Sequence, residues 1–80
     1  MLLSDLPRHA PAIVLAVNDA AAPDPIANRL RELGFVAGEP VRVIAQGPVG
    51  REPLLVQIGY TRFALRRAEA ARVQVQAEAA

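Results

Sequence analysis

The sequence contains no cysteine, no tryptophan and no lysine, and it has a single histidine and a single tyrosine. Without cysteine there is no disulfide framework, no iron–sulfur centre, no cysteine-based zinc site and no thiol nucleophile. Aromatic residues make up only 4% of the chain, too few for a groove that binds proline-rich peptides or for platforms that stack single-stranded nucleic acid. These absences exclude several classes of function.

Charge of either sign is not in excess, because nine arginines face eight acidic residues and the net charge is +1. Such a balance predicts no strong attraction to nucleic acid or to an anionic membrane. The largest local excess lies in the C-terminal part, at Arg62, Arg66, Arg67 and Arg72, moderated by Glu69. We interpret it as a solvated face or a contact with an acidic partner surface.

Candidate groups for catalysis are equally sparse. A nucleophile–base pair would have to combine Ser4 or Thr61 with His9, and no G-x-S-x-G elbow presents the hydroxyl. The pair Gly47-x-x-Gly50 lacks the lysine and the Ser/Thr of a P-loop. We therefore expect no enzymatic activity.

Length and hydrophobic content predict one domain over residues 1–80, since a chain of 80 residues has room for a single core and 52% of it is hydrophobic. The N-terminus has an acid at Asp5 and a proline at Pro7 and does not resemble a secretory signal. The apolar run at residues 12–17 is far shorter than the ~20 residues that span a bilayer. We expect a cytoplasmic protein without direct membrane insertion.

One helix is clearly predicted. Asp24 is a natural N-cap and Pro25 suits the first helical position. The apolar stripe expected to face inward consists of Ile26, Leu30 and Leu33. Gly34 can adopt the left-handed conformation that ends a helix, and Phe35 is placed to close a Schellman-type cap against Leu30.

Period-two alternation predicts five short strands, at residues 12–17, 41–46, 54–58, 63–65 and 73–75. Residues 47–50 are predicted to form a turn or loop, residues 59–62 a tight connection, and residues 66–71 a single helical turn. In the last strand Val73 and Val75 are expected inside and Arg72, Gln74 and Gln76 exposed. The result is a mainly β fold, a small, partly open barrel of about five strands with one helix inserted after the first. We expect its core over residues 3–76 and a frayed end at residues 77–80.

Three segments in order resemble the FeoA family. Residues 29–38 read R-L-R-E-L-G-F-V-A-G and resemble its R-L-x-x-L-G-hydrophobic-x-x-G segment. Residues 47–56 resemble its P-x-G-x-P-hydrophobic stretch, and residues 63–70 its A-L-R-[RK]-x-E-A segment, before a closing Val73-x-Val75 strand. Each piece alone is a weak signal, but the order and spacing of all three are specific.

The resemblance implies an SH3-like barrel that serves bacterial ferrous iron uptake as a cytosolic accessory protein. Members of the family support FeoB, a membrane iron transporter with a cytosolic G domain, so the expected activity is protein–protein interaction with that partner. The alternative is a stand-alone regulatory domain similar to the SH3-like C-terminal domain of iron-dependent repressors. Such a domain would sense metal or modulate GTP hydrolysis by a partner.

Docking residues are expected first at the end of the predicted helix and in the turn after it. This set consists of Arg29, Arg31, Leu33, Gly34, Phe35 and Val36. A second set, in the loop, consists of Gly47, Pro48 and Gly50. The simpler interpretation makes the apolar members core, the glycines backbone geometry, and the outward Arg31 a solvated charge.

The sequence departs from the family pattern at two places. Many relatives carry a glycine in the turn before the first strand, where this chain has residues 8–11, Arg-His-Ala-Pro. The segment at residues 50–53, Gly-Arg-Glu-Pro, is one residue longer than the usual G-D-P. Both differences concern surface loops and leave the predicted fold unchanged.

Metal ligands are nearly absent, so no cofactor is expected to be required. One imidazole without thiolates cannot form a closed structural site. His9 with Asp5 one helical turn earlier would hold Fe²⁺ weakly. An adventitious Zn²⁺ bridging two molecules through His9 and a neighbour's carboxylate is also compatible with the sequence, and a homodimer stays open.

Overall fold

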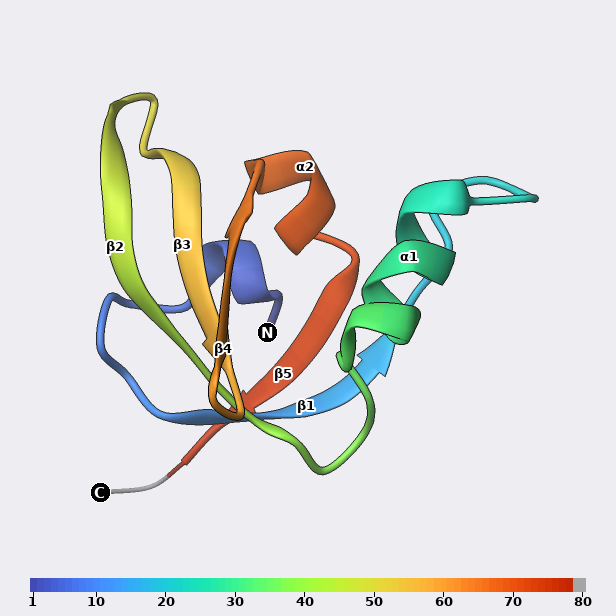
Figure 1. The fold of residues 1–80 in the computed structure, drawn as a ribbon, viewed down its shortest axis with the longest axis horizontal. Helices are drawn as coiled ribbons and strands as arrows, with labels where there is room; N and C mark the ends of the chain where they lie inside the picture. Colours follow the sequence, from blue (N-terminus) through green and yellow to red (C-terminus); the bar gives the residue numbers. More distant parts are fainter. Residues whose placement is uncertain (79–80) are drawn as a thin grey trace.

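The computed structural model describes residues 1–78, which form one curved antiparallel sheet with a main helix beside it (Figure 1). The strands are β1 (Ala12–Val17), β2 (Pro40–Val49), β3 (Glu52–Ile58), β4 (Thr61–Leu65) and β5 (Val73–Ala77). Helix α1 (Pro25–Leu33) follows β1, the short α2 (Arg67–Ala70) precedes β5, and a 3-10 turn, η1 (Leu3–Asp5), begins the chain. The predicted order of five strands with one helix after the first is confirmed, and η1 is an addition to it.

The sheet has the strand order β4-β3-β2-β1-β5, so β4 and β5 are its edges. Strand β1 pairs along its length with β5 but meets β2 only through Ala12 and Ile13. Register shifts in β1 and β2 mark bulges, which bend strands and increase their twist. The sheet therefore curls into a partly open barrel and leaves one side of β4 without a strand. Within residues 1–78, no helix has the length and hydrophobicity needed to cross a bilayer.

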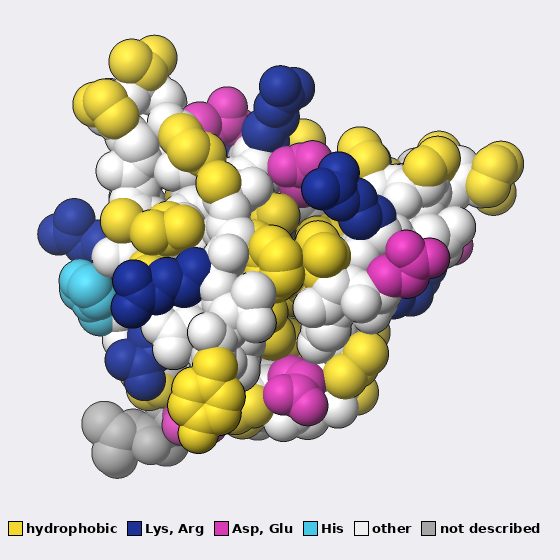
Figure 2. Space-filling model, in the orientation of Figure 1, with side chains coloured by type: hydrophobic (Ala, Val, Ile, Leu, Met, Phe, Trp, Pro, Cys, Tyr) yellow, Lys and Arg dark blue, Asp and Glu magenta, His cyan; other side chains and the backbone are white. Residues whose placement is uncertain are grey.

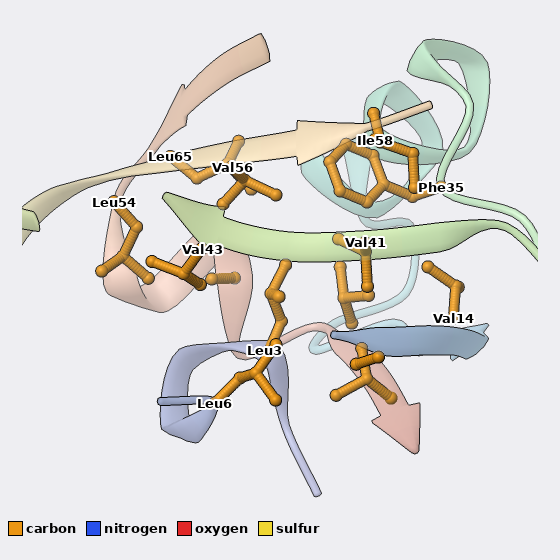
Figure 3. Close-up of a cluster of buried hydrophobic side chains, with 14 of the residues drawn as sticks. Leu3, Leu6, Val14, Phe35, Val41, Val43, Leu54, Val56, Ile58 and Leu65 are labelled. Carbon is orange, nitrogen blue, oxygen red and sulfur yellow. The ribbon is translucent and has the colours of Figure 1, made fainter. Parts of the chain in front are cut away.

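The core lies between the strands and η1 (Figure 3). Alternate residues of the strands face it, including Leu54, Val56 and Ile58 of β3, as predicted from the alternation. Leu3, the first residue of η1, and Leu6, the residue after its end, pack into the same cluster and are almost fully buried. The N-terminal segment is thus part of the core.

Helix α1 begins and ends as predicted. The Asp24 carboxylate accepts hydrogen bonds from the N–H groups of Ile26 and Ala27, at 3.1 and 3.2 Å, and Pro25 occupies the first turn. Gly34 is left-handed with φ 113°, and the Phe35 N–H bonds the Leu30 carbonyl at 3.1 Å. This is the six-to-one bond of the predicted Schellman cap.

The face that α1 turns inward differs from the prediction. Ala27 and Leu30 are buried, Leu33 is partly buried, and Ile26 is 38% exposed. Ala27 is small enough to let the helix approach the sheet closely, so the helix packs through its Ala27–Leu30 side. The prediction that Ile26 belongs to the core was therefore wrong. The inward face of the helix is rotated, so that the next residue, Ala27, is buried instead.

The β2–β3 hairpin is longer than predicted. The expected loop at residues 47–50 was wrong, because β2 continues through Val49 and pairs there with Glu52. Only Gly50 and Arg51 form the turn, with φ of 62° and 58°, the pair of left-handed residues that a type I′ hairpin requires. The next hairpin also turns over two residues, Gly59 and Tyr60, so β4 begins two residues earlier than predicted.

The turn before β1 explains the first departure from the family pattern. His9 has φ 70°, a left-handed conformation in which glycine is favoured. Its N–H donates to the Val43 carbonyl of β2 at 2.7 Å. The turn therefore has the left-handed residue that glycine supplies in many relatives, and in this chain that residue is His9.

The C-terminal end of the sheet extends beyond the predicted start of fraying. Ala77 belongs to β5, and the Glu78 N–H bonds the Pro11 carbonyl at 3.0 Å. The remainder of the predicted frayed end, Ala79 and Ala80, lies outside the described residues. The helical turn expected at residues 66–71 is present as α2.

Gly47 tests the geometry of the longer hairpin. A Cβ atom at Gly47 would collide with the backbone carbonyl of Glu52 on the facing strand, a rigid neighbour. We expect Gly47→Ala to lower the free energy of unfolding by about 2 kcal/mol, measured by urea denaturation, because the strands must separate. The control Val49→Ala, at an exposed position of the same strand, should change it by less than about 0.5 kcal/mol. Equal effects of the two substitutions would contradict this geometry.

Candidate docking groove between α1 and β4

An apolar groove separates α1 from the edge strand β4. Figure 2 shows hydrophobic side chains at the surface in the hollow between these two elements. The groove has a volume of about 290 Å³ and is lined by Pro25, Ile26, Arg29, Leu30, Leu33, Phe63, Ala64, Leu65 and Glu69. It is named the α1–β4 groove below.

The walls of the α1–β4 groove come from the two elements on either side of it. On the helix, Ile26 is exposed and Leu33 is partly buried, because the helix packs on the sheet through another face. On β4, Phe63 is partly buried, and its ring lies 6.0 Å from that of the buried Phe35 with the planes tilted by 48°. This geometry is typical of a favourable aromatic pair and fixes the orientation of Phe63.

The charged residues of the groove are not equivalent. The Glu69 carboxylate is engaged, because it accepts the Arg66 backbone N–H at 2.8 Å and caps α2. Arg29 is exposed and makes no side-chain hydrogen bond or ion pair within residues 1–78. A partner can therefore approach Arg29 without first breaking an internal ion pair.

The position of α1, and so the width of the groove, depends on a buried ion pair. Besides capping the helix, the Asp24 carboxylate accepts the Ala20 N–H at 2.7 Å and the Arg72 Nε at 2.7 Å. The Asp24 and Arg72 side chains are only 2% and 16% exposed. Arg72 also donates from Nη1 to the Ala68 carbonyl of α2 at 2.7 Å. The start of α1 is thereby tied to the segment between α2 and β5.

These contacts shift the titration of Asp24. The hydrogen bond from the Ala20 N–H, followed by that from the Arg72 guanidinium, holds the pKa of the carboxyl well below its ordinary value of 3.8. The prediction that Arg72 is exposed was wrong. The cap at Asp24 could be read from the sequence, but its arginine partner follows 48 residues later and no local pattern marks it.

Arg31 was expected to point outward and to be available to a partner. Its Nη2 instead donates to the Val17 carbonyl at 2.7 Å and to Asp19 Oδ1 at 2.9 Å, and its Nη1 to Asn28 Oδ1 at 2.9 Å. The side chain remains 39% exposed, but its donors hold α1 to the end of β1. Arg31 lies outside the groove.

The remaining residues of the first predicted docking set are divided between interior and surface. Arg29 and Leu33 line the groove. Gly34 caps the helix and Phe35 is buried, whereas Val36 is 46% exposed beyond the helix end. The groove residues not predicted as site are Pro25, Ile26, Leu30, Phe63, Ala64, Leu65 and Glu69.

The second predicted set lies elsewhere. Gly47, Pro48 and Gly50 belong to the far end of the β2–β3 hairpin, on the other side of the molecule from α1 (Figure 1). Gly47 has a structural reason in the close approach of Glu52, and Gly50 in its left-handed turn. The structure therefore does not join the two predicted sets into one surface.

The predicted metal ligands are not reinforced by neighbours. His9 and Asp5 are both exposed, and residues 1–78 contain no group of three or more His, Cys, Asp or Glu side chains able to hold an ion. Asp5 lines a shallow depression with Arg8, Arg51 and Arg67. Three guanidinium groups make that depression an unfavourable place for a cation.

Comparison with known proteins gives one family. The model of the FeoA domain matches residues 1–77. A search of the curated proteins found no match.

Solved structures of similar proteins share the fold. FeoA of Stenotrophomonas maltophilia, solved with zinc and described as an SH3 domain protein and a candidate activating factor of ferrous iron transport, is 64% identical. It matches with a TM-score of 0.89 over 95% of this chain and 89% of that chain. FeoA of Chlorobium tepidum is 32% identical, with a TM-score of 0.82 over 99% of this chain and 71% of its own. Iron(II) transport protein A of Clostridium thermocellum is 27% identical, with a TM-score of 0.83 over 96% of this chain and 45% of its own. The predicted SH3-like fold is thereby confirmed.

The ion pair that positions α1 can be tested with Asp24→Asn. Asparagine still accepts the two capping hydrogen bonds through Oδ1. Its Nδ2 group replaces the oxygen that accepts from the Ala20 N–H and from Arg72, so the Arg72 charge loses its partner. We expect the melting temperature at pH 7 to fall by roughly 5 °C or more. The control Asp19→Asn, at the exposed partner of Arg31, should lower it by much less.

The difference in melting temperature between the wild type and Asp24→Asn should depend on pH. Because folding lowers the pKa of Asp24, its stabilising contribution is present above the ordinary value of 3.8 and is lost as the pH falls below it. The difference in melting temperature between wild type and Asp24→Asn should stay constant from about pH 7 to pH 5 and shrink in more acidic buffer. A difference that grows on acidification would contradict the assignment.

Proposed function

Because this chain belongs to the FeoA family, whose members serve ferrous iron transport, we propose that it is an accessory protein that binds the cytosolic part of a FeoB-type transporter. The main support for this proposal is the α1–β4 groove. It combines apolar side chains with Arg29, which forms no ion pair within residues 1–78. Its 290 Å³ lies just below the ~300–1,000 Å³ usual for small-molecule sites, and it suits side chains of another protein.

We propose that the protein acts without catalysing a reaction. The one carboxylate among the described residues with a clearly shifted pKa is Asp24, and its shift comes from capping α1 and binding Arg72. Strongly perturbed groups in clefts often mark catalytic sites, but Asp24 is buried and fully engaged in the fold. Binding is the activity that the groove supports.

Between the two predicted docking regions, we propose the helix side as the contact surface. Arg29 and Leu33 lie in the groove together with Ile26, so charge and apolar area meet there. The hairpin region offers Val49, which is 81% exposed, and Pro48 beside it. The depression next to the hairpin is lined by Gln46 and Arg51 together with other charged residues, and neither Pro48 nor Val49 lines it. A single exposed apolar residue is normal on a protein surface, whereas contiguous exposed apolar side chains mark interaction sites.

Docking in the groove can be tested with Ile26→Asp. The position is exposed in the first turn of α1, where an acid is favourable to the helix, so the fold should be retained. A charge inside an apolar contact should weaken affinity for the purified cytosolic part of a FeoB-type transporter by about tenfold or more, measured by calorimetry. Circular dichroism checks the fold.

The matched control is Val49→Asp, the same chemical change at the exposed hairpin tip. It should leave the affinity within about twofold of wild type. Loss of binding in Val49→Asp with wild-type affinity in Ile26→Asp would place the contact on the hairpin and contradict docking in the groove. No binding by the wild-type protein would overturn the proposed function itself.

For divalent metal we propose weak, intermolecular binding and no resident cofactor. The Stenotrophomonas relative was solved with zinc. In this chain His9 is exposed on a turn, while the nearest predicted carboxylate, Asp5, lies among three arginines. Imidazole from one molecule and carboxylate from another would give zinc a partial ligand set that a single molecule lacks.

Removal of the imidazole tests this proposal. Added Zn²⁺ should raise the sedimentation coefficient of the wild-type protein, EDTA should reverse the increase, and His9→Ala should abolish it. The same variant should retain wild-type affinity for the cytosolic part of the transporter, because His9 lies outside the groove. Tight one-to-one Zn²⁺ or Fe²⁺ binding by a monomer, unchanged in His9→Ala, would contradict intermolecular binding and favour a metal-sensing role.

A further inference from the structure

Strand β4 leaves a row of backbone hydrogen-bonding groups without a strand partner. It pairs with β3 from Ile58↔Thr61 onward, across a two-residue turn. In such a hairpin the residues beside the turn exchange hydrogen bonds, and every second pair thereafter does the same. Arg62 and Ala64 fall on the intervening pairs, so their N–H and C=O groups point away from β3. Because β4 is an edge strand, no other strand of residues 1–78 receives them.

This unpaired edge borders the α1–β4 groove. Phe63 and Leu65 face the interior, whereas the side chain of Ala64 lies on the opposite face of the sheet and is exposed. Ala64 nevertheless lines the groove together with both of them. Its backbone is therefore accessible from within the groove, where hydrogen-bonding groups and apolar side chains lie next to each other.

We propose that the edge of β4 accepts an extended segment of the partner as an additional strand, in a mode of recognition known as β-strand addition. The segment alternates apolar residues, which enter the groove beside Phe63 and Leu65, with acidic residues, which lie on the face of Arg62. The proposal deepens the function proposed above and rests on it for the identity of the partner as the iron transporter. The extended conformation of the segment and its alternation of apolar and acidic residues follow from the unpaired edge of β4, the groove and Arg62.

The acidic character of the segment follows from charge. Arg62 projects from the exposed face of β4, where the acidic residues lie, and Arg66 follows the strand immediately. Arg29 stands on the opposite wall of the groove, on the apolar side of the segment, and adds to the positive charge around it. All three are exposed, and no side-chain hydrogen bond or ion pair of theirs occurs within residues 1–78. Opposite charges in directly facing positions stabilise a strand pair, and like charges destabilise it.

The same charges argue against a second copy of this chain as the occupant. An antiparallel pairing of two β4 strands about Phe63 would set Arg62 of one molecule opposite Ala64 of the other and diagonally next to its Arg62 and Arg66. Edge strands commonly carry a charged residue as protection against such pairing. Arg62 therefore disfavours self-association and attracts an acidic strand. Unlike an ordinary protected edge, this edge also has a groove beside it.

The test uses Ala64→Pro in the 80-residue protein. Proline removes the outward N–H of Ala64 and places its ring on the edge, but it leaves the hydrogen bonds to β3 intact, so edge strands tolerate it. The matched control Ala64→Val keeps the N–H and has a side chain that suits strands. Circular dichroism and thermal unfolding should show both variants folded.

The first probe is a synthetic peptide in which valine and glutamate alternate. Its length of about seven residues is usual for a strand. It should shift the amide NMR signals of Arg62 and Ala64 in the wild-type protein and slow the hydrogen exchange of these amides. Ala64→Pro should bind it about tenfold more weakly or worse, and Ala64→Val within about threefold of wild type. A valine–lysine peptide should not bind. Absence of any shift at β4, or equal affinity in Ala64→Pro, would overturn strand addition.

The second probe is the cytosolic part of a FeoB-type transporter, which separates the two proposals. If wild type and Ala64→Val bind it and Ala64→Pro is weakened about tenfold, strand addition is supported for that partner. If all three bind alike, docking stands and strand addition is overturned. If none binds, the proposed partner is wrong, and the peptide titration alone decides whether β4 accepts an acidic strand.

Discussion

The carboxylate of Asp24 is the contact on which the arrangement of this protein depends. It caps α1, receives the N–H of Ala20 in the preceding loop, and binds Arg72 between α2 and β5. An isolated nine-residue helix would be marginal in water, so its formation requires such tertiary contacts. A second arginine, Arg31, holds the other side of the same helix to the end of β1. Together these bonds determine where α1 lies.

The groove is a consequence of that placement. With its start fixed by Asp24, the helix packs on the sheet through Ala27 and Leu30, and Ile26 remains exposed opposite β4. The barrel does not close at this strand, so an apolar hollow and an open sheet edge lie side by side. Both features favour contact with another protein. The titratable residues, by contrast, are scattered over the fold. The one with the clearly shifted pKa, Asp24, uses its carboxylate to hold α1 in place. This division supports a role in transport through binding.

Local signals in the sequence predicted the local features of the fold. The N-cap, the left-handed Gly34, the succession of strands and helix along the chain and the helical turn before β5 all depend on neighbouring residues and are confirmed. What could not be predicted depends on contacts between distant segments. The partner of Asp24 and the role of Arg31 are of this kind, as is the rotation of α1 that exposes Ile26. The hairpin was predicted too short because Gly47 and proline usually signal a loop, whereas here the glycine permits close strand pairing. Only two residues of the groove were therefore predicted as site.

We propose that the protein works through the surface between α1 and β4. The most direct test of this proposal is amide NMR mapping of the isotopically labelled protein titrated with the unlabelled cytosolic part of a FeoB-type transporter. If the transporter binds this surface, the largest perturbations should gather on α1 from Ile26 to Leu33 and on β4, with little change at the hairpin tip near Val49. Perturbations concentrated on the hairpin or around His9, with α1 and β4 unchanged, would contradict it.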